Sequence, residues 1–492
     1  MTDSPPNSAQ NPAAEQEKTV TLPGKLGRLP LWRQVATLAF WPFLEQILSF
    51  AVSTVDLLFA ARLAEGAERV ALLDALGLGG YLSWLMMIIQ SATAGGVMAI
   101  VSRAAGKGDP QEARDGLSQG LILGLIVGLS SGLILWLLAP VLVQLFGLAA
   151  NSQELAISYL RILTGTCPAL ALFYVCTHSL RGSGDTRTPF WFMVVINVAN
   201  IGISAALVLP DPGQTTSPID IASGLAWGTT GAWLLGAALI LAFLYFRPCR
   251  PVAKNETKLC LRHVSWQLEP VMAQRIGRIA WPQGLEMTGM WALNALTVGA
   301  IARLPYQSAL GAHIVAIRVE SLSFLPGYAI GTAGAALVGQ YLGASSPYFA
   351  KKAFRYSLYL ATAFMGGPGV LFVVAPELLV HLILGTAPAD DSTAALAAQA
   401  IPAIALCGYF QPALAIALVA KTCLRGAGAT RTVLIVSYSC MILSRAILIP
   451  LGVTYFSLNL TQIWLLMMSD VLAQALLLLW VYKRGNWLKT KV

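Results

Sequence analysis

The sequence predicts an all-α membrane protein with twelve transmembrane helices in two similar halves. Three observations lead to this fold class: an apolar composition, twelve apolar runs that could cross a bilayer, and a motif that recurs at a fixed distance. Hydrophobic residues make up 56% of the 492 residues and charged residues only 11%, whereas a soluble domain carries roughly a quarter charged residues. A chain this apolar cannot cover itself with polar side chains, so lipid must be the solvent for much of it.

A helix needs about 20 mostly apolar residues to cross the hydrocarbon core of a bilayer. Twelve runs in the chain meet this requirement. They are residues 36–61, 75–101, 118–146, 155–178, 189–209, 222–246, 279–302, 308–338, 352–376, 397–423, 432–456 and 461–482. Several contain a proline, such as Pro42 or Pro282. We expect such breaks where neighbouring helices or a cavity satisfy the freed backbone groups.

The basic residues predict the orientation of the spans. If the spans alternate in direction, 25 of the 32 Lys and Arg residues fall on the side that carries both chain ends. Only Arg62, Arg69 and Arg303 fall on the opposite side. Lys and Arg are enriched in cytoplasmic loops, so both termini are predicted to be cytoplasmic. This asymmetry also accounts for the net charge of +9, and we expect no nucleic-acid partner.

A repeat divides the chain into halves. The segment LRGSGDTRT (180–188) returns as LRGAGATRT (424–432), identical at seven of nine positions. Two further echoes occur in the same order, the WP pair at 41–42 and 281–282 and the Gly-rich ends of the second and eighth spans. Six spans separate the copies, so both insert in the same direction. This is a parallel repeat, whose substrate site is expected between the halves. The glycines of these loops are expected to provide tight turns with positive φ.

The repeat gives the predicted organisation of the chain. Residues 1–30 are predicted to be a disordered cytoplasmic tail and 247–276 a cytoplasmic linker, and 485–492 form a C-terminal tail. Residues 31–246, hereafter the N-half, carry the first six spans, and residues 277–484, the C-half, carry the last six.

The cysteines and the motif content point away from redox, metal and enzymatic chemistry. The seven cysteines are odd in number, scattered, and never in CxxC spacing. We therefore expect neither a disulfide framework nor a metal site. HExxH and clustered His/Asp sets do not occur in the spans, so an enzyme with one of these sites is not predicted. No cofactor is expected.

Several motifs resemble the multidrug and toxic compound extrusion (MATE) family, and its DinF-like branch in particular. They are GDTRTP (184–189) after the fourth span, RVESLSFLPGYAIGTAGAALVGQYLGA (318–344) in the eighth, and VD (55–56) late in the first. The resemblance covers about residues 30 to 485. It implies a V-shaped, two-lobed antiporter with alternating access, which exports organic, commonly cationic and amphiphilic, compounds in exchange for H+ or Na+.

Two departures from the family's patterns concern the coupling ion. Some members carry sodium-linked acids on the seventh and tenth helices, but the tenth span here has no acid, and Lys421 is its only charge. Another branch has an acid late in the fifth span, where Ser204 stands here, four residues after Asn200. The ion-coupling residues are therefore not a full copy of either pattern.

The leading candidate for ion coupling is Asp56, about 20 residues into the first span. An ionisable group near the bilayer centre costs roughly 2.5–3.5 kcal/mol on insertion scales. A carboxyl in a partly dry cavity binds a proton more readily than in water, so Asp56 could take up a proton outside and release it inside. The alternative is that Asp56 only ends its helix among the lipid headgroups.

Glu45 and Glu286 occupy matching places in the first and seventh spans, each shortly after a WP pair. Each is predicted either to hydrogen-bond its own proline-kinked helix or to contact the ion or substrate. Glu286 is favoured for the second role because Gln283 and Asn294 lie on the same span. Polar side chains expected to line the cavity are Gln283, Asn294, Asn200 and His313.

Arg445 and Asp470 approach the membrane midplane from opposite sides, in the eleventh and twelfth spans. A buried ion pair between them is the expected, structural role. His313, near the outer start of the eighth span, is expected either to pack between helices or to relay protons.

The sequence predicts a monomeric, multi-pass protein of the plasma (inner) membrane that acts on small organic substrates. Two alternatives stay open. One is a lipid-linked oligosaccharide flippase of the same superfamily, although few basic residues fall within the spans to hold an anionic headgroup. The other is a differently folded twelve-helix secondary carrier.

Overall fold

The computed structural model describes Leu22 and residues 26–209, 217–249, 258–262, 264–306, 308–384, 391–490 and 492. Most of the predicted tail 1–30 therefore lies outside the described residues, and these contain helices but no strand. The α-helices are α2 (Leu31–Leu63), α3 (Gly66–Lys107), α4 (Pro110–Leu145), α5 (Ala150–Thr164), α6 (Cys167–Gly182), α7 (Arg187–Val208), α8 (Pro218–Phe246), α9 (Pro270–Ala302), α10 (Ala309–Gly343), α11 (Pro347–Val374), α12 (Pro376–Leu384), α13 (Asp391–Gly426), α14 (Thr430–Met441), α15 (Ile449–Phe456) and α16 (Leu460–Arg484). Between α14 and α15 lies a π-helical segment, η2 (Ile442–Leu448), and 3-10 turns occur at η1 (Leu26–Arg28) and η3 (Asn486–Lys489).

The helices match the predicted spans. Within the described part of the chain, nine helices are long and apolar enough to cross a membrane, and the pair α5 and α6 makes a tenth. Helices α2 and α9, 33 residues each, cover the predicted first and seventh spans. By length alone these two helices bring the number in the described residues to twelve. The predicted all-α membrane fold is confirmed.

Helix ends follow local sequence signals. Helix α4 starts at Pro110, and the Asp109 side chain accepts hydrogen bonds from two backbone N–H groups of its first turn. Asn459 and Gln462 form a capping box at the start of α16, and Gly485 ends that helix with a φ of 73°. Caps of this kind satisfy the orphan backbone groups of a helix end.

One span and one loop differ from a simple run of straight helices. The fourth span is bent by 46° between α5 and α6, just before Pro168, because a proline cannot continue the backbone hydrogen bonds of the preceding turn. After α11, the short helix α12 was not predicted.

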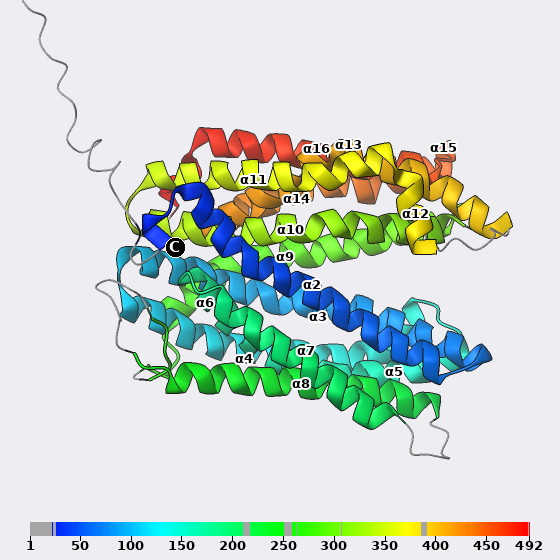
Figure 1. The fold of residues 1–492 in the computed structure, drawn as a ribbon, viewed down its shortest axis with the longest axis horizontal. Helices are drawn as coiled ribbons and strands as arrows, with labels where there is room; N and C mark the ends of the chain where they lie inside the picture. Colours follow the sequence, from blue (N-terminus) through cyan, green and yellow to red (C-terminus); the bar gives the residue numbers. More distant parts are fainter. Residues whose placement is uncertain are drawn as a thin grey trace, which may run out of the picture.

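The helices form two groups that meet at the end of the molecule where the C-terminus lies and diverge toward the other end (Figure 1). Helices α3 to α8 form one group, and α9 to α16 form the other. Helix α2 packs against α7 in its own half and also against α10 and α11, while α9 packs against both α3 and α14. The first helix of each half therefore joins the two groups.

Glycines let the halves touch at the C-terminal end. A Cβ added at Gly106 would lie 1.8 Å from the backbone oxygen of Gln340, and one at Gly343 would lie 2.0 Å from that of Arg103. Gln340 also donates a hydrogen bond of 2.8 Å to the backbone oxygen of Gly182. The Gly-rich ends of the second and eighth spans, predicted as echoes of one another, thus pack together.

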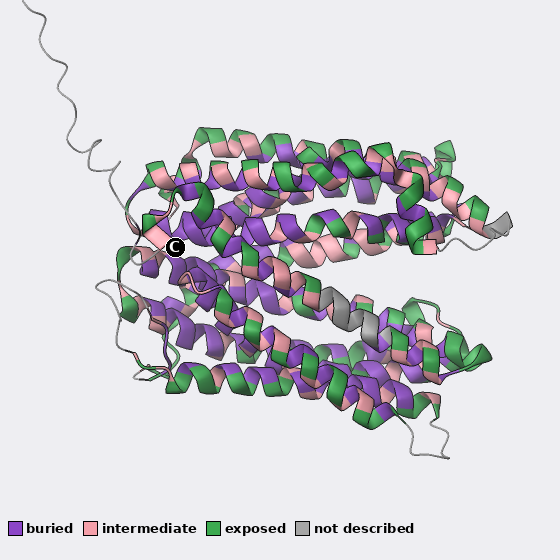
Figure 2. Ribbon diagram, viewed as in Figure 1, coloured by how far each residue is buried: buried purple, intermediate pink, exposed green. Residues whose placement is uncertain are grey.

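The outward surfaces of the helices carry the exposed residues, and the buried residues lie between helices (Figure 2). Helix α4 exposes Leu129, Leu133 and Leu137 on one face. An apolar face of this kind suits contact with lipid tails.

The expectation that the cysteines form no disulfide is wrong. Cys249 and Cys260 are bonded, with a Cα–Cα distance of 5.6 Å. The linker turns back on the end of α8, where the Leu261 N–H donates to the Leu244 oxygen at 2.9 Å. This return brings together two cysteines whose spacing of 11 residues matches no motif.

Candidate functional site

Asp56 lies in α2 within a chain of polar side chains from three helices of the N-half. The Thr229 hydroxyl, on α8, donates to Asp56 Oδ2 at 3.4 Å. Asn200, on α7, donates from Nδ2 to the same Thr229 oxygen at 3.1 Å. Asp56 is only 9% exposed. The structure thus connects Asp56 and Asn200, two predicted site residues, through a threonine that was not predicted.

The chain of hydrogen bonds leaves several oxygens without a partner among the described residues. These buried atoms are Asp56 Oδ1, Asn200 Oδ1 and Ser204 Oγ. Ser204 packs tightly against α8, because a Cβ added at Gly228 would lie 2.1 Å from its Oγ. An unpartnered acceptor is costly in a dry interior, and a bound proton or a small cation would satisfy oxygens of this kind.

Glu45 pairs with the arginine of the first repeat motif. Arg181 Nη2, on α6, lies 2.6 Å from both Glu45 Oε1 and Oε2. Both side chains are buried, at 8% and 9% exposure. The pair joins the first and fourth spans of the N-half, so Glu45 has a partner outside its own helix.

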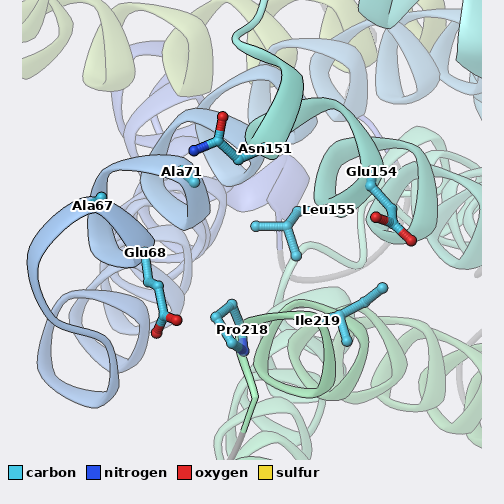
Figure 3. Close-up of a pocket in the computed structure, with 8 residues that line it drawn as sticks. All are labelled: Ala67, Glu68, Ala71, Asn151, Glu154, Leu155, Pro218 and Ile219. Atoms are coloured by element: carbon cyan, nitrogen blue, oxygen red, sulfur yellow. The ribbon is translucent and has the colours of Figure 1, made fainter.

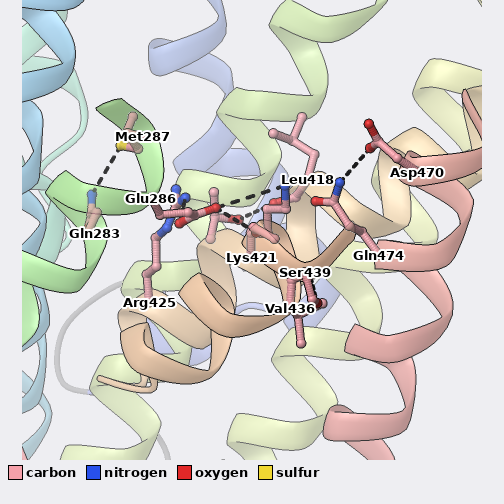
Figure 4. Close-up of polar contacts among 12 residues, drawn as sticks. Gln283, Glu286, Met287, Leu418, Lys421, Arg425, Val436, Ser439, Asp470 and Gln474 are labelled. Atoms are coloured by element: carbon pink, nitrogen blue, oxygen red, sulfur yellow. Dashed lines mark hydrogen bonds and ion pairs between the residues drawn. The ribbon is translucent and has the colours of Figure 1, made fainter. Parts of the chain in front are cut away.

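Glu286 pairs in the same way with the arginine of the second motif. Arg425 Nη2, on α13, lies 2.5 Å from Glu286 Oε2, and the Ser437 hydroxyl donates to Oε1 at 2.8 Å. Lys421 Nζ lies 4.0 Å from the same Oε1. Glu286, Lys421 and Arg425 converge from α9 and α13 (Figure 4).

The two ion pairs are equivalent under the repeat. The glutamates are 241 residues apart and the arginines 244 residues apart. The arginines were predicted to lie in cytoplasmic loops, but they lie in the last turns of α6 and α13 and point into the bundles. A recurring LRG motif, together with a WP pair followed by a glutamate after two residues in the N-half and three in the C-half, was the signal that could have predicted these pairs.

Arg445 and Asp470 form a third ion pair, 2.8 Å apart between Nε and Oδ2. Arg445 Nη1 also donates to Asn294 Oδ1, and Gln474 donates to Asp470 Oδ1 at 2.7 Å (Figure 4). Arg445 lies in the π-helical segment η2, and π-bulges are frequent at functional sites.

The remaining predicted cavity residues lie apart from these clusters. Gln283 is buried where α9 crosses α3, with its amide 2.5 Å from the position of a Cβ added at Gly95. His313 packs edge-on against Trp464, with ring centroids 5.6 Å apart, and its Nδ1 has no partner among the described residues.

A surface pocket lies away from every predicted site residue. It is formed at the ends of α3, α5 and α8 (Figure 3). Its lining residues are Ala67, Glu68, Ala71, Asn151, Glu154, Leu155, Pro218 and Ile219. No cluster of three or more metal-ligating side chains occurs in the described parts of the chain.

Solved structures of transporters share this fold. A MOP superfamily transporter from Pyrococcus furiosus superimposes with a TM-score of 0.81 at 19% identity, over 96% of this chain and 100% of that chain. A structure described as the outward-facing conformation of a multidrug resistance MATE family transporter gives a TM-score of 0.82 at 18% identity, over 96% and 100%.

Curated relatives point the same way. The "Probable multidrug resistance protein NorM" of Thermotoga maritima is 24% identical over 85% of this chain and 86% of its own length. The protein of that name in Burkholderia pseudomallei is 27% identical, with 79% of each chain covered. The "FAD transporter" of Shewanella oneidensis is 25% identical over 60% of this chain and 66% of its own.

The family model named MatE matches residues 43–205 and 282–451, one segment in each half. These segments include Asp56, Glu45 and Glu286, and the match confirms the resemblance drawn from the sequence motifs. The chain belongs to the MATE family of multi-pass membrane transporters.

Proposed function

We propose that this protein is a secondary active antiporter that exports organic amphiphiles in exchange for H+ or Na+, with Asp56 as the ion-coupling residue. The observation that carries the proposal is the isolation of this carboxylate. Glu45, Glu286 and Asp470 each have a cationic partner within 2.8 Å. Asp56 has only the Thr229 hydroxyl among the described residues.

A carboxylate without a counter-ion can change charge without breaking an ion pair. When Asp56 is ionised, its charge lies in a buried setting that favours uptake of a proton or cation. When Asp56 is protonated, the side chains of Asp56, Thr229 and Asn200 can hydrogen-bond to one another without placing a net charge inside the helix bundle. Asp56 lies on α2, which contacts both groups of helices. A change in the charge of Asp56 can therefore affect the packing between the two halves.

Alternating access requires the halves to open at one end while they close at the other. The contacts between Gly106 and Gln340 and between Gly343 and Arg103 close one end, and the helices diverge toward the other (Figure 1). A closed cytoplasmic end supports an outward-open arrangement, in which Asp56 would load its ion from outside. We propose that substrate leaves on the same side.

The orientation and location are also proposals. The basic residues support a plasma-membrane protein with cytoplasmic termini. The Cys249–Cys260 disulfide would then lie on the cytoplasmic side, where thiols are kept reduced. We therefore expect both cysteines to be free thiols in the cell.

Efflux from proteoliposomes tests the function. Two fluorescent amphiphiles are loaded in separate experiments, the organic cation ethidium and a rhodamine with a free carboxyl, and H+ and Na+ gradients are imposed separately at equal membrane potential. We expect efflux driven by at least one ion gradient and abolished by the matching ionophore. Efflux that needs neither gradient would contradict the antiport mechanism, and the ion that drives it decides between H+ and Na+.

A further inference from the structure

The two repeat-related ion pairs differ in one charge. In the N-half, Arg181 and Glu45 balance one another. In the C-half, Lys421 stands four residues before Arg425, where Thr177 stands four before Arg181. Among the described residues, the glutamate of the C-half therefore has two cationic groups within 4.0 Å, and the second of them, Lys421, has no cationic counterpart at the equivalent position of the N-half.

The second cation is not needed to hold the glutamate. Glu286 Oε2 already accepts from Arg425 at 2.5 Å, and Oε1 accepts from Ser437 at 2.8 Å. Lys421 Nζ lies 4.0 Å from Oε1, beyond hydrogen-bond distance. The ammonium group has no hydrogen bond to any described residue, and Arg425 Nε also lacks an acceptor. Two neighbouring cationic groups thus retain free donors.

Charged groups of both signs surround Lys421. They are the acids Glu286 and Asp470 and the bases Arg425 and Arg445. An ionisable group inside a membrane span is costly and marks a candidate functional site.

Glu320, on α10, is a third acid of this region, and it interacts with Arg445.

The side chains of Lys421 and Arg425 are partly accessible, although the Arg425 Nε atom itself is buried. The side chains of Lys421 and Arg425 are 15% and 16% exposed, whereas that of Glu286 is 4% exposed. A charged group within a span faces the bundle interior or a water-filled cavity rather than lipid. Lys421 and Arg425 are thus more exposed than the glutamate that they face.

We propose that Lys421 and Arg425 form a subsite for the acidic group, a carboxylate or a phosphate, of the transported molecule. The Lys421 ammonium donates to its oxygens, and Arg425 adds a second positive charge beside them. Charge-assisted hydrogen bonds of this kind are about twice as strong as neutral ones. This proposal rests on the proposed transport function and names the chemistry of its substrate. It assigns the acidic group to the C-half and leaves the coupling ion in the N-half.

Equilibrium binding to the purified full-length protein, without any gradient, tests the subsite. Two matched pairs of fluorescent probes distinguish a carboxylate from a phosphate. The first pair is a rhodamine with a free carboxyl and its methyl ester, and the second is flavin mononucleotide and riboflavin. We expect the acid to bind more tightly than its uncharged counterpart in at least one pair, by on the order of tenfold. The pair that shows the difference identifies carboxylate or phosphate.

Variants of Lys421 and a matched control complete the test. Lys421→Gln should remove the preference for the acid, and Lys421→Arg should restore most of it. Thr177→Ser, at the equivalent place in the N-half, should leave it unchanged. The Glu286–Arg425 pair stays intact in all three, so the protein should fold, and a thermal melt checks this.

The subsite proposal is overturned if neither probe pair shows a preference for the acid, or if Lys421→Gln keeps the preference in a folded protein. Failure of the antiport mechanism would appear in the gradient experiment instead. If the protein prefers the acid at equilibrium but shows no gradient-driven efflux, the subsite proposal stands and the antiport mechanism is wrong.

Discussion

The N-half and the C-half contain the same buried ion pair but differ at the positions beside it. Counting from the paired glutamates, Asp56 stands eleven residues after Glu45, and Thr297 stands eleven after Glu286. Thr297 is buried and its hydroxyl donates to its own helix, to the Leu293 oxygen at 2.9 Å. The N-half thus has an additional acid where the C-half has a threonine.

The reverse substitution occurs on the fourth span of each half. There the C-half has an additional base, Lys421, and the N-half has Thr177, whose hydroxyl donates to the Tyr174 oxygen at 3.1 Å. A duplicated scaffold with an additional acid in one half and an additional base in the other can hold two different charged species. We assign the ion to the negative side and the acid of the substrate to the positive side.

The largest expected difference between the halves concerns the loss of each arginine. Arg181→Met would break the Arg181–Glu45 pair, and breaking a buried pair costs about 3–5 kcal/mol in soluble proteins. Arg425→Met should cost less, because Lys421 and Ser437 remain beside Glu286. Thermal unfolding in detergent compares the two variants. Equal losses would show that Lys421 gives Glu286 no support, and Arg181→Met with Glu45→Gln is the control that should regain stability.

A smaller effect is expected for the ion pair that only the C-half contains. Ile201 is the N-half counterpart of Arg445, at the 244-residue offset of the motifs. Arg445→Ile alone would leave Asp470 with only Gln474, at a cost of about 3 kcal/mol, whereas Arg445→Ile with Asp470→Leu should be more stable than the single variant. Folded yield and melting temperature measure both. A double variant no better than the single would mean that the two charges act independently.

The smallest expected effect concerns the turns that follow the two arginines. Gly184 and Gly428 have φ values of 96° and 85°, a conformation that costs an alanine about 1–2 kcal/mol. Gly428→Ala should be the more harmful change, because its Cβ would lie 2.4 Å from the Val492 side chain. At Gly184 the nearest atom is the Gln340 amide at 3.5 Å. If Gly184→Ala lowers the melting temperature more, the tail contact at Gly428 has no influence on stability.

The fold could be predicted from the sequence because its signals are local. Apolar runs of bilayer length and a repeat with constant spacing predicted every long helix, and the positive φ of Gly184 and Gly428 followed from the repeated loops. Helix α12 was missed because nine residues are too few to be recognised by length. The Cys249–Cys260 bond was missed because the return of the linker depends on tertiary contacts.

The site could be predicted only in part, because lateral packing decides which side chains meet. Asp56 was identified by its charge within an apolar span. Thr229 was missed because a threonine in such a span carries no signal until α8 is placed beside α2. Arg181 and Arg425 were placed in loops because their motifs end the spans, yet burial and a glutamate partner draw both side chains inward.

The most direct test of the account compares Asp56 with its C-half counterpart in H+-driven efflux from proteoliposomes at equal protein level. Asparagine matches aspartate in shape but cannot bind and release a proton. We predict that Asp56→Asn folds normally while efflux falls to background, that Thr297→Ala keeps most of the activity, and that wild-type efflux weakens as the outer pH rises and the site fails to protonate. Efflux driven only by Na+ would show that Na+ is the coupling ion, with Asp56 still the proposed coupling site. Near wild-type H+-driven efflux by folded Asp56→Asn would contradict the account and leave Glu286 as the next candidate.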